Sequence, residues 1–215
     1  MSFDLSFHEY SISGLGSRRF SVTAKGPGGH SWDDRERSSA IEKMVHFLMG
    51  LKARQDGLAE RHSAQFSFNM GLIKGGEGVN IIAANAEVHF EFRSTSESLL
   101  EEAEIIVAEE VGRINDCCDG VFLEMFIKGV RPAALPVKPE LAEELVREIW
   151  RRHSVPVMKT TRSTNINYPL SKGWPALCTG LCECGGYHTE DEYIILDSVH
   201  TGWKLLNGIV SELVL

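Results

Sequence analysis

The stretch 75–93, GGEGVNIIAANAEVHFEFR, is the part of the sequence that decides the fold. In its second half Val88, Phe90 and Phe92 alternate with polar residues, and this period of two predicts a strand with one buried face. The glycine-rich start is typical of a loop that uses positive φ angles. Asn80 then interrupts an apolar run, which indicates either a turn residue or a group that binds a ligand.

Regular apolar spacing predicts further elements on both sides of this stretch. Alternating apolar residues predict strands at 18–25, 66–72 and 121–127, and apolar residues at helical spacing predict helices at 41–51 and 99–114. With the central strand, the order is β-α-β-β-α-β, the ferredoxin-like arrangement. Both helices would cover one face of a four-stranded sheet, so the other face and at least one sheet edge would need a partner or a cover.

Polar residues are expected at the ends of these elements. Ser38 or Ser39 could cap the first helix, and Ser96 or Ser98 could cap the second. The segment 55–63 is expected to be a polar loop.

The residues after 130 predict a second, smaller region. Its expected elements are a helix around 141–149, short strands at 155–157 and 175–178, and a C-terminal helix at 199–213. They would form the edge of an α/β layer with too few strands to close a core alone. We therefore expect an α+β chain divided into an N-terminal strand or linker, a ferredoxin-like domain and a partial α/β segment, at 1–16, 17–130 and 131–215.

Composition excludes several classes of protein. The 215-residue chain has 43% hydrophobic and 24% charged residues, which is ordinary for a globular protein. A net charge of −8 and the lack of a basic run argue against nucleic acid binding. No apolar stretch approaches the roughly 20 residues of a membrane-spanning helix, and the start lacks the features of a signal peptide, so we expect no membrane partner and a cytoplasmic location.

Several side chains are suited to binding or catalysis. His30 and His188 each follow glycine-rich segments, so their imidazoles can project from loops, and the carboxylates after His188 suit a zinc site. Arg93, on the polar face of the central strand, could pair with a carboxylate. Ser163 and Thr164 begin a turn rich in hydroxyls and amides, which either holds a ligand or caps a short helix. For the histidines and the arginine, the alternative is a solvated surface residue.

The five cysteines do not suggest a disulfide framework, but three of them raise another alternative. Cys178, Cys182 and Cys184 lie near His188 and could hold a structural zinc ion. Their spacing, C-x3-C-x-C-x3-H, lacks the usual paired C-x2-C geometry. Cys178 fits better as a small apolar residue inside a strand.

Five separated stretches together resemble one family, that of the di-zinc exopeptidases and deacylases. This family includes aminoacylase, peptidase T, glutamate carboxypeptidase and succinyl-diaminopimelate desuccinylase. The GPGGHSW form is most similar to the di- and tripeptidase-like branch. The matching stretches are KGPGGHSW, GGEGVNIIAANAEVHFEFRS, STNINYPLSKGWPALCTGL, GGYHTEDEYI and the final helix, and in order they cover nearly the whole chain.

The resemblance implies a role for each region and for most of the candidate residues. Residues 17–130 would be the lid or dimerisation domain, and the residues after it the C-terminal part of a zinc-binding catalytic domain. His30 would reach across a homodimer into the active site of the partner subunit and stabilise an oxyanion. Asn80 and Arg93 would bind the substrate, a small peptide or an N-acyl amino acid. His188 would be the last protein ligand of a two-zinc site.

The chain also departs from the pattern of this family. The turn that normally reads STDAN reads STNIN here, so Asn165 replaces an aspartate and the role of Ser163 and Thr164 is open. Nothing matches the family's H-x-D pair, bridging aspartate and Glu-Glu pair, which supply the other ligands and the catalytic base. We therefore expect this chain alone to be inactive and to bind zinc weakly or not at all, as the C-terminal portion of an exopeptidase. A non-catalytic dimerisation module and a deacylase of the same family are the alternatives.

Overall fold

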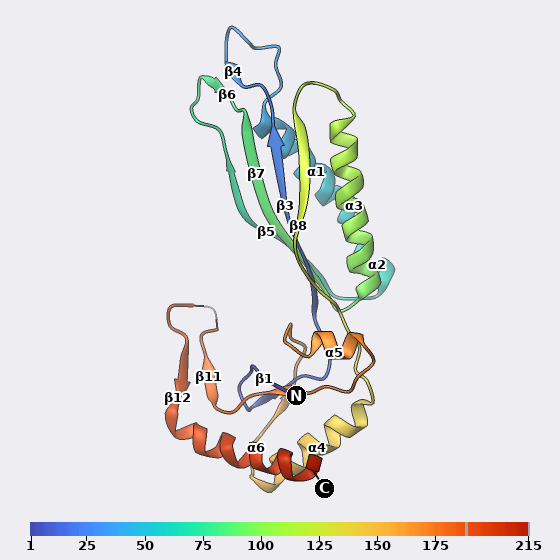
Figure 1. Cartoon of the computed structure of the whole chain (residues 1–215), viewed down its shortest axis with the longest axis vertical. Helices are drawn as coiled ribbons and strands as arrows, with labels where there is room; N and C mark the ends of the chain where they lie inside the picture. The colour runs from blue at the N-terminus through green and yellow to red at the C-terminus, as the bar shows by residue number, and fades with distance from the viewer. Residues whose placement is uncertain (188, 215) are drawn as a thin grey trace. The chain divides into compact units, whose positions relative to one another are not determined.

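The structure, a computed structural model, describes residues 1–187 and 189–214 (Figure 1). The chain folds into two compact units. The first, which we call the sheet unit, is Gly16–Arg131. The second, the terminal unit, combines Met1–Leu15 with the residues from Pro132 onward.

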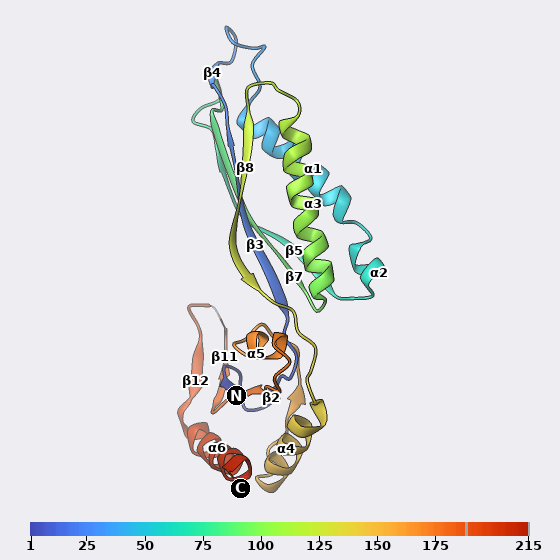
Figure 2. The same ribbon diagram turned by 45° about the vertical axis from the view of Figure 1, so that its right-hand side comes forward.

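The sheet unit contains a four-stranded antiparallel sheet with two helices on one of its faces (Figures 1 and 2). The strand order is β5-β7-β3-β8, so the first and third strands along the chain are central. This is the ferredoxin-like topology, and the predicted α+β class is confirmed. The main elements are β3 (Gly16–Lys25), α1 (Ala40–Gln55), β5 (Phe66–Gly75), β7 (Asn85–Ser94), α3 (Glu97–Asn115) and β8 (Phe122–Arg131).

The alternation in β3 and β7 places one row of side chains beneath the helices. Phe20 lies opposite Phe90 and Val22 opposite Val88, and all four are buried. The Phe20 and Phe90 rings stack with centroids 5.3 Å apart. The apolar faces of α1 and α3 cover this row, so the period of two in the strands and the helical period in the sequence meet in one core. The helix residues that complete it are Met44, Phe47, Leu51, Leu99, Ala103 and Val107.

Serine side chains begin both helices. The Ser39 hydroxyl accepts a hydrogen bond from the Ile41 N–H (3.2 Å), and the Ser96 hydroxyl accepts one from the Leu99 N–H (3.3 Å). Each bond satisfies one of the N–H groups that the first helical turn leaves without a partner. Of the two serines that the sequence offers at each helix, the N-caps are therefore Ser39 and Ser96.

The prediction of a polar loop at 55–63 is wrong, because a short helix, α2 (Leu58–His62), lies there. Leu58 is completely buried, although it is an isolated apolar residue in the sequence. Arg61 and His62 both contact the Glu102 carboxylate on α3, at 2.7 and 2.6 Å. One buried leucine and these two pairs attach the segment to α3.

The terminal unit is built from very short strands and three helices. Strand β1 (Ser2–Phe3) pairs in parallel with β10 (Cys178–Thr179), and β2 (Glu9–Tyr10) pairs in parallel with β9 (Met158–Lys159). The strand expected at 155–157 therefore begins only at Met158, after Pro156, which has no N–H to donate to a ladder. The remaining elements are α4 (Pro139–Arg152), α5 (Asn167–Ser171), β11 (Glu183–Gly185), β12 (Tyr193–Ile195), the 3-10 turn η1 (Leu196–Ser198) and α6 (Val199–Val214).

This unit has a small core of its own. Its centre is Trp150 on α4, which is buried and donates a 2.6 Å hydrogen bond from Nε1 to the Phe7 carbonyl oxygen. The other buried members are Phe7, Ile12, Ala142, Val146, Ile149, Leu177, Leu205 and Ile209. Along α6, in contrast, Val199, Trp203, Val210 and Leu213 are exposed at helical spacing. Within the residues described, no helix combines the length and apolar character that crossing a membrane requires.

Candidate functional site

The structure brings two of the predicted site residues, His30 and Asn80, together at one end of the sheet unit. Strand β4 (Gly29–His30) pairs with β6 (Ile81–Ile82), and His30 lies opposite Ile81. The Ser31 N–H donates a 3.0 Å hydrogen bond to the Asn80 carbonyl oxygen. Gly28, with φ of 65°, turns the chain into this small ladder in a conformation that favours glycine. Both side chains are exposed, so they can contact another molecule.

The surroundings of His30 leave one ring nitrogen available as a donor. The backbone N–H groups of Trp32 and Asp33 both point at Nδ1, at 3.4 Å, and the Asp33 carboxylate lies 3.3 Å from the same nitrogen. When the ring is neutral with Nδ1 accepting, the proton is on Nε2; when it is charged, Nδ1–H can face Asp33 and Nε2 still carries a proton. In both states Nε2–H can donate to an anionic oxygen.

Sequence reasoning did not find the acidic residues that hold this loop. The Asp34 carboxylate accepts a 2.8 Å hydrogen bond from the backbone N–H of His30 and pairs with Arg37 at 3.0 Å. The only signal in the sequence is two aspartates three and four residues after the histidine, which is the spacing of a tight turn.

Arg93 lies near the opposite end of β7. It is eight positions after Asn85, which corresponds to roughly 26 Å along a strand. Its guanidinium binds the Glu91 carboxylate at 2.7 and 3.3 Å, and Arg19 binds the same carboxylate at 3.2 Å. Burial raises the pKa of Glu91, but the hydrogen bonds from Arg93 and Arg19 outweigh it and hold the pKa below its usual value. Within one chain, Arg93 is not part of the group formed by His30 and Asn80.

Ser163 and Thr164 belong to the terminal unit and lie just before α5, whose first residue is Asn167. Thr164 is buried, and its hydroxyl accepts a 3.4 Å hydrogen bond from the Ile166 N–H. Asn167 accepts a 3.0 Å bond from the Thr164 N–H and donates to the carbonyl oxygens of Leu15 and Pro132 at 2.9 and 2.8 Å. The turn is thus held by local polar contacts, but the N-cap of α5 is Ile166, which makes no side-chain capping bond. A role of Ser163 and Thr164 in binding substrate stays a prediction.

His188, the predicted zinc ligand, lies outside the residues that the structure describes. Among residues 1–187 and 189–214, no group of three or more histidine, cysteine or acidic side chains is arranged to hold a metal ion. A catalytic zinc site needs about three protein ligands, so these residues do not fit such a site and we derive no metal-dependent step from them. The described members of the alternative zinc site, Cys178, Cys182 and Cys184, do not form such a group by themselves. Cys178 is buried in β10, as expected of a small apolar residue.

A second surface of the sheet unit is unusually apolar, and we call it the β5–α1 surface. Strand β5 is at the edge of the sheet, so one side of its backbone has no neighbouring strand among the residues described. Leu48 on α1 and Ile73 on β5 line one hollow, and Ile41 and Ile73 line another, so the helix and the edge strand lie side by side. The exposed apolar members are Ile41 (40%), Val45 (44%), Met49 (67%), Met70 (48%), Leu72 (36%) and Ile73 (62%).

Comparison with known proteins finds a family match for the part of the chain that carries this surface. Residues 13–116, from just before β3 to the end of α3, match the family described as peptidase dimerisation domain. This part of the chain therefore resembles a peptidase dimerisation domain. The predicted resemblance of the whole chain to the exopeptidases and deacylases is confirmed as well.

Three individual proteins are similar to this chain over most of its length. Acetylornithine deacetylase of Buchnera aphidicola subsp. Schizaphis graminum (strain Sg) is 24% identical over 201 residues, which are 90% of this chain and 51% of that protein. A tripeptidase from Staphylococcus aureus subsp. aureus Mu50 has a TM-score of 0.77 at 16% identity, covering 98% of this chain and 54% of the other. Aminopeptidase PepT from Bacillus cereus ATCC 10987 has a TM-score of 0.73 at 16% identity, covering 99% and 56%.

The likeness to the two solved structures shows a shared fold at low identity. The chain spans about half the length of the curated relative it matches. The β5–α1 surface lies in the part of the chain that matches the dimerisation family, and the roles of six residues stay predictions: His30, Asn80, Arg93, Ser163, Thr164 and His188.

Proposed function

We propose that the dimerisation domain joins two copies of this chain through the β5–α1 surface. The observation that carries the proposal is the combination of an unpaired edge strand with an exposed apolar stripe on the neighbouring helix. Two β5 edges related by a twofold axis would pair their free backbone groups, and the same axis would bring the two α1 stripes together.

The number of exposed apolar side chains on the β5–α1 surface supports a stable association. Full burial of a Val, Leu, Ile or Met side chain contributes about 1.5–3 kcal/mol. Six such side chains per subunit, each about half exposed, would then contribute roughly 9–18 kcal/mol to a dimer. This is comparable with the association cost of about 4–15 kcal/mol, before the hydrogen bonds between the two edges are counted.

We further propose that this dimer belongs to a zinc-dependent exopeptidase, of the di- and tripeptidase type, that hydrolyses amide bonds of small peptides. His30 and Asn80 would then act in the active site of the partner subunit, where the exposed Nε2–H of His30 stabilises the oxyanion formed from the amide carbonyl. In such an enzyme zinc would supply Lewis-acid chemistry, with His188 as one predicted ligand. Arg93 would bind a carboxylate of the substrate after exchanging its present partner, Glu91.

A deacylase acting on N-acyl amino acids is the second candidate. It is favoured by the curated relative, an acetylornithine deacetylase, whereas two of the similar solved structures are a tripeptidase and PepT. The two candidates share the amide bond that is cut and differ in the group on its acyl side. Assays of a catalytically complete protein containing this domain, with a tripeptide and with an N-acetyl amino acid, decide between them.

Light scattering on the purified chain tests the dimer. Val45→Glu and Ile73→Lys should each raise the dissociation constant at least about tenfold, because a twofold interface contains each residue twice. Ile105→Glu is the matched control, since Ile105 is 57% exposed but lies on α3, outside the β5–α1 surface. A chain that stays monomeric at high concentration, or a dimer that only Ile105→Glu disrupts, would contradict the proposal.

The role of His30 is tested separately, in the catalytically complete protein. His30→Ala should mainly lower kcat and leave the dimer intact, since His30 lies outside the β5–α1 surface. An unchanged kcat in an intact dimer would remove the oxyanion role, and it would leave the dimerisation proposal standing.

A further inference from the structure

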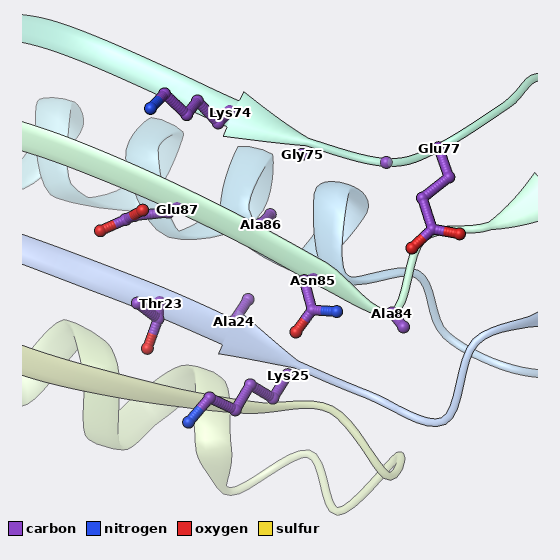
Figure 3. A pocket seen from close by; sticks show the side chains of 11 residues that line it. Thr23, Ala24, Lys25, Lys74, Gly75, Glu77, Ala84, Asn85, Ala86 and Glu87 are labelled. Atoms are coloured by element: carbon purple, nitrogen blue, oxygen red, sulfur yellow. The ribbon is translucent and has the colours of Figure 1, made fainter.

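The charged side chains around a hollow on the open face of the sheet do not converge on one point (Figure 3). In Figure 3 the Lys74 side chain runs along β5 away from Glu77, and Lys25 pairs with Glu124 at 2.9 Å. These groups are therefore not assembled around a common ligand. At the opposite end of the sheet unit, where Figures 1 and 2 show α2 beside the start of α3, polar side chains of the two helices do converge.

Three of these side chains form a continuous chain of hydrogen bonds. The Ser98 hydroxyl oxygen lies 3.3 Å from Nδ1 of His62, and Nε2 of the same ring lies 2.6 Å from the Glu102 carboxylate. The Ser98 residue is exposed, whereas the His62 side chain is only 19% exposed. This is the order of nucleophile, base and carboxylate that serine hydrolases use, with the two ring nitrogens exchanged.

The carboxylate determines where the protons of this chain lie. An ionised carboxylate only accepts hydrogen bonds, so Nε2 of His62 carries a proton, and in the neutral ring Nδ1 is then the acceptor for the Ser98 O–H. The Ser96 hydroxyl, which accepts from the Leu99 N–H, lies 3.0 Å from the Ser98 oxygen and can donate to it. All the donors can therefore point toward Glu102, which leaves the Ser98 proton directed at a base.

The orientation of the base is set by the protein. The hydrogen bond from His62, followed by that from Arg61, lowers the pKa of Glu102, so this carboxylate is ionised at neutral pH. Arg61 binds the second carboxylate oxygen at 2.7 Å. Leu58, which is completely buried, fixes the helix that carries both Arg61 and His62. The imidazole is thus oriented toward Ser98 before any substrate arrives.

We propose that Ser98 is a nucleophile that takes the acyl group of small activated esters, with His62 as its base and Glu102 as a positioning residue. The Ser98 oxygen forms a bond to the carbonyl carbon while the Ser98 proton moves to Nδ1 of His62, and the bond from that carbon to the ester oxygen breaks. A phenolate leaving group departs without a proton, so one base suffices for this step.

A second step returns the site to its starting state. His62 first releases its proton to solvent and then takes a proton from a water molecule that attacks the acyl carbon. The bond from this carbon to the Ser98 oxygen breaks, and Ser98 recovers a proton from His62. Because Ser98 is the second residue of the 19-residue helix α3, the negative charge that develops on the carbonyl oxygen lies near the positive end of the helix dipole. The site does not depend on the proposed dimer or on the proposed zinc-dependent activity.

Reaction of the purified chain with phenylmethanesulfonyl fluoride, followed by mass spectrometry of its peptides, tests the nucleophile. General-base catalysis contributes about 10²–10⁴-fold, so Ser98 should be labelled at least about a hundredfold faster than Ser211, an exposed serine of α6. His62→Gln should lower the labelling of Ser98 to the rate of Ser211, and p-nitrophenyl acetate should acetylate Ser98 with the same dependence on His62. Labelling of Ser98 that is no faster than that of Ser211, or that is unchanged in His62→Gln, would overturn the proposal.

The ¹⁵N chemical shifts of the His62 ring test the positioning role of Glu102. In the neutral ring of the wild-type chain, the proton should be on Nε2. Glu102→Gln, whose amide can also donate, should mix the two tautomers and slow the labelling of Ser98 at least about tenfold. Glu101→Gln, at the exposed neighbouring position of α3, is the matched control and should change neither. A wild-type ring with its proton on Nδ1, or equal labelling rates in the wild-type chain and Glu102→Gln, would contradict the proposal.

Discussion

Gly50, in the middle of α1, provides the sharpest test of how the sheet unit is packed. Replacing glycine by alanine inside a helix normally stabilises it by about 1 kcal/mol. Here an added Cβ would lie 1.8 Å from Oε1 of Glu110 on α3, so the two atoms cannot both stay in place. We therefore expect Gly50→Ala to destabilise the protein, against the helix propensity.

The magnitude follows from the contacts of Glu110. Its side chain is 1% exposed, and its oxygens accept hydrogen bonds from Nε and Nη2 of Arg113 at 2.6–3.2 Å. Breaking a fully buried pair costs about 3–5 kcal/mol, but Arg113 is 57% exposed, so we take about 2 kcal/mol. Overpacking adds about 1–3 kcal/mol, partly offset by relaxation of the flexible carboxylate and by the gain in propensity. The net expectation is a loss of about 1–3 kcal/mol.

Hydrogen exchange of the α1 and α3 amides under increasing urea measures this loss and separates the sheet unit from the terminal unit. Gly112→Ala is the matched control, because an added Cβ on this exposed glycine of α3 meets nothing within 4 Å and should stabilise by about 1 kcal/mol. Adding Glu110→Ala to Gly50→Ala should cost less than the sum of the two single changes. If Gly50→Ala stabilises the protein as much as Gly112→Ala does, the close approach of α1 to Glu110 is refuted.

Two further substitutions test the stability of the sheet unit and of the terminal unit separately. Burial raises the pKa of Asp119, but hydrogen bonds from Lys43, Ser38 and the Val121 N–H hold it below its usual value, so Asp119→Asn should destabilise by about 1–3 kcal/mol at neutral pH. The difference in free energy of unfolding between the wild-type chain and this variant should be complete above pH ~4. It should disappear as the pH falls through the folded-state pKa of Asp119. Urea unfolding that gives the same difference at every pH would refute this role of the Asp119 carboxylate. Trp150→Phe leaves the Phe7 carbonyl without its hydrogen-bond donor. Hydrogen exchange of the α4 amides should therefore report an opening free energy lower by about 1–3 kcal/mol, and the amides of the sheet unit should be unaffected.

The sheet unit could be predicted from the sequence because its elements are long enough to show their period. Strand β7 buries Val88, Phe90 and Phe92 on one side, and α1 repeats its buried residues over four turns. The helix α2 could not be predicted in this way. Five residues with a single large apolar side chain have no period, and the segment is held by Leu58 and by Glu102 on another helix.

The terminal unit and the candidate site were harder to predict from the sequence, because their contacts depend on segments far apart in the chain. Strands of two or three residues, such as β1, β9 and β10, are set by the segments beside them and not by their own pattern. The proximity of His30 and Asn80 depends on a two-residue ladder between segments 50 residues apart, so spacing alone could not reveal it. The distance from Asn85 to Arg93, in contrast, follows directly from the length of one strand.

The most direct test of the account is the hydrogen exchange of the β5 backbone at high and at low protein concentration. Half of the N–H groups of an edge strand have no partner in a monomer, and pairing of two β5 strands would satisfy them. We predict that alternate amides of Phe66–Gly75 exchange slowly at concentrations where light scattering reports a dimer, and rapidly after dilution to monomer. A dimer in which these amides exchange as fast as in the monomer would contradict association through β5.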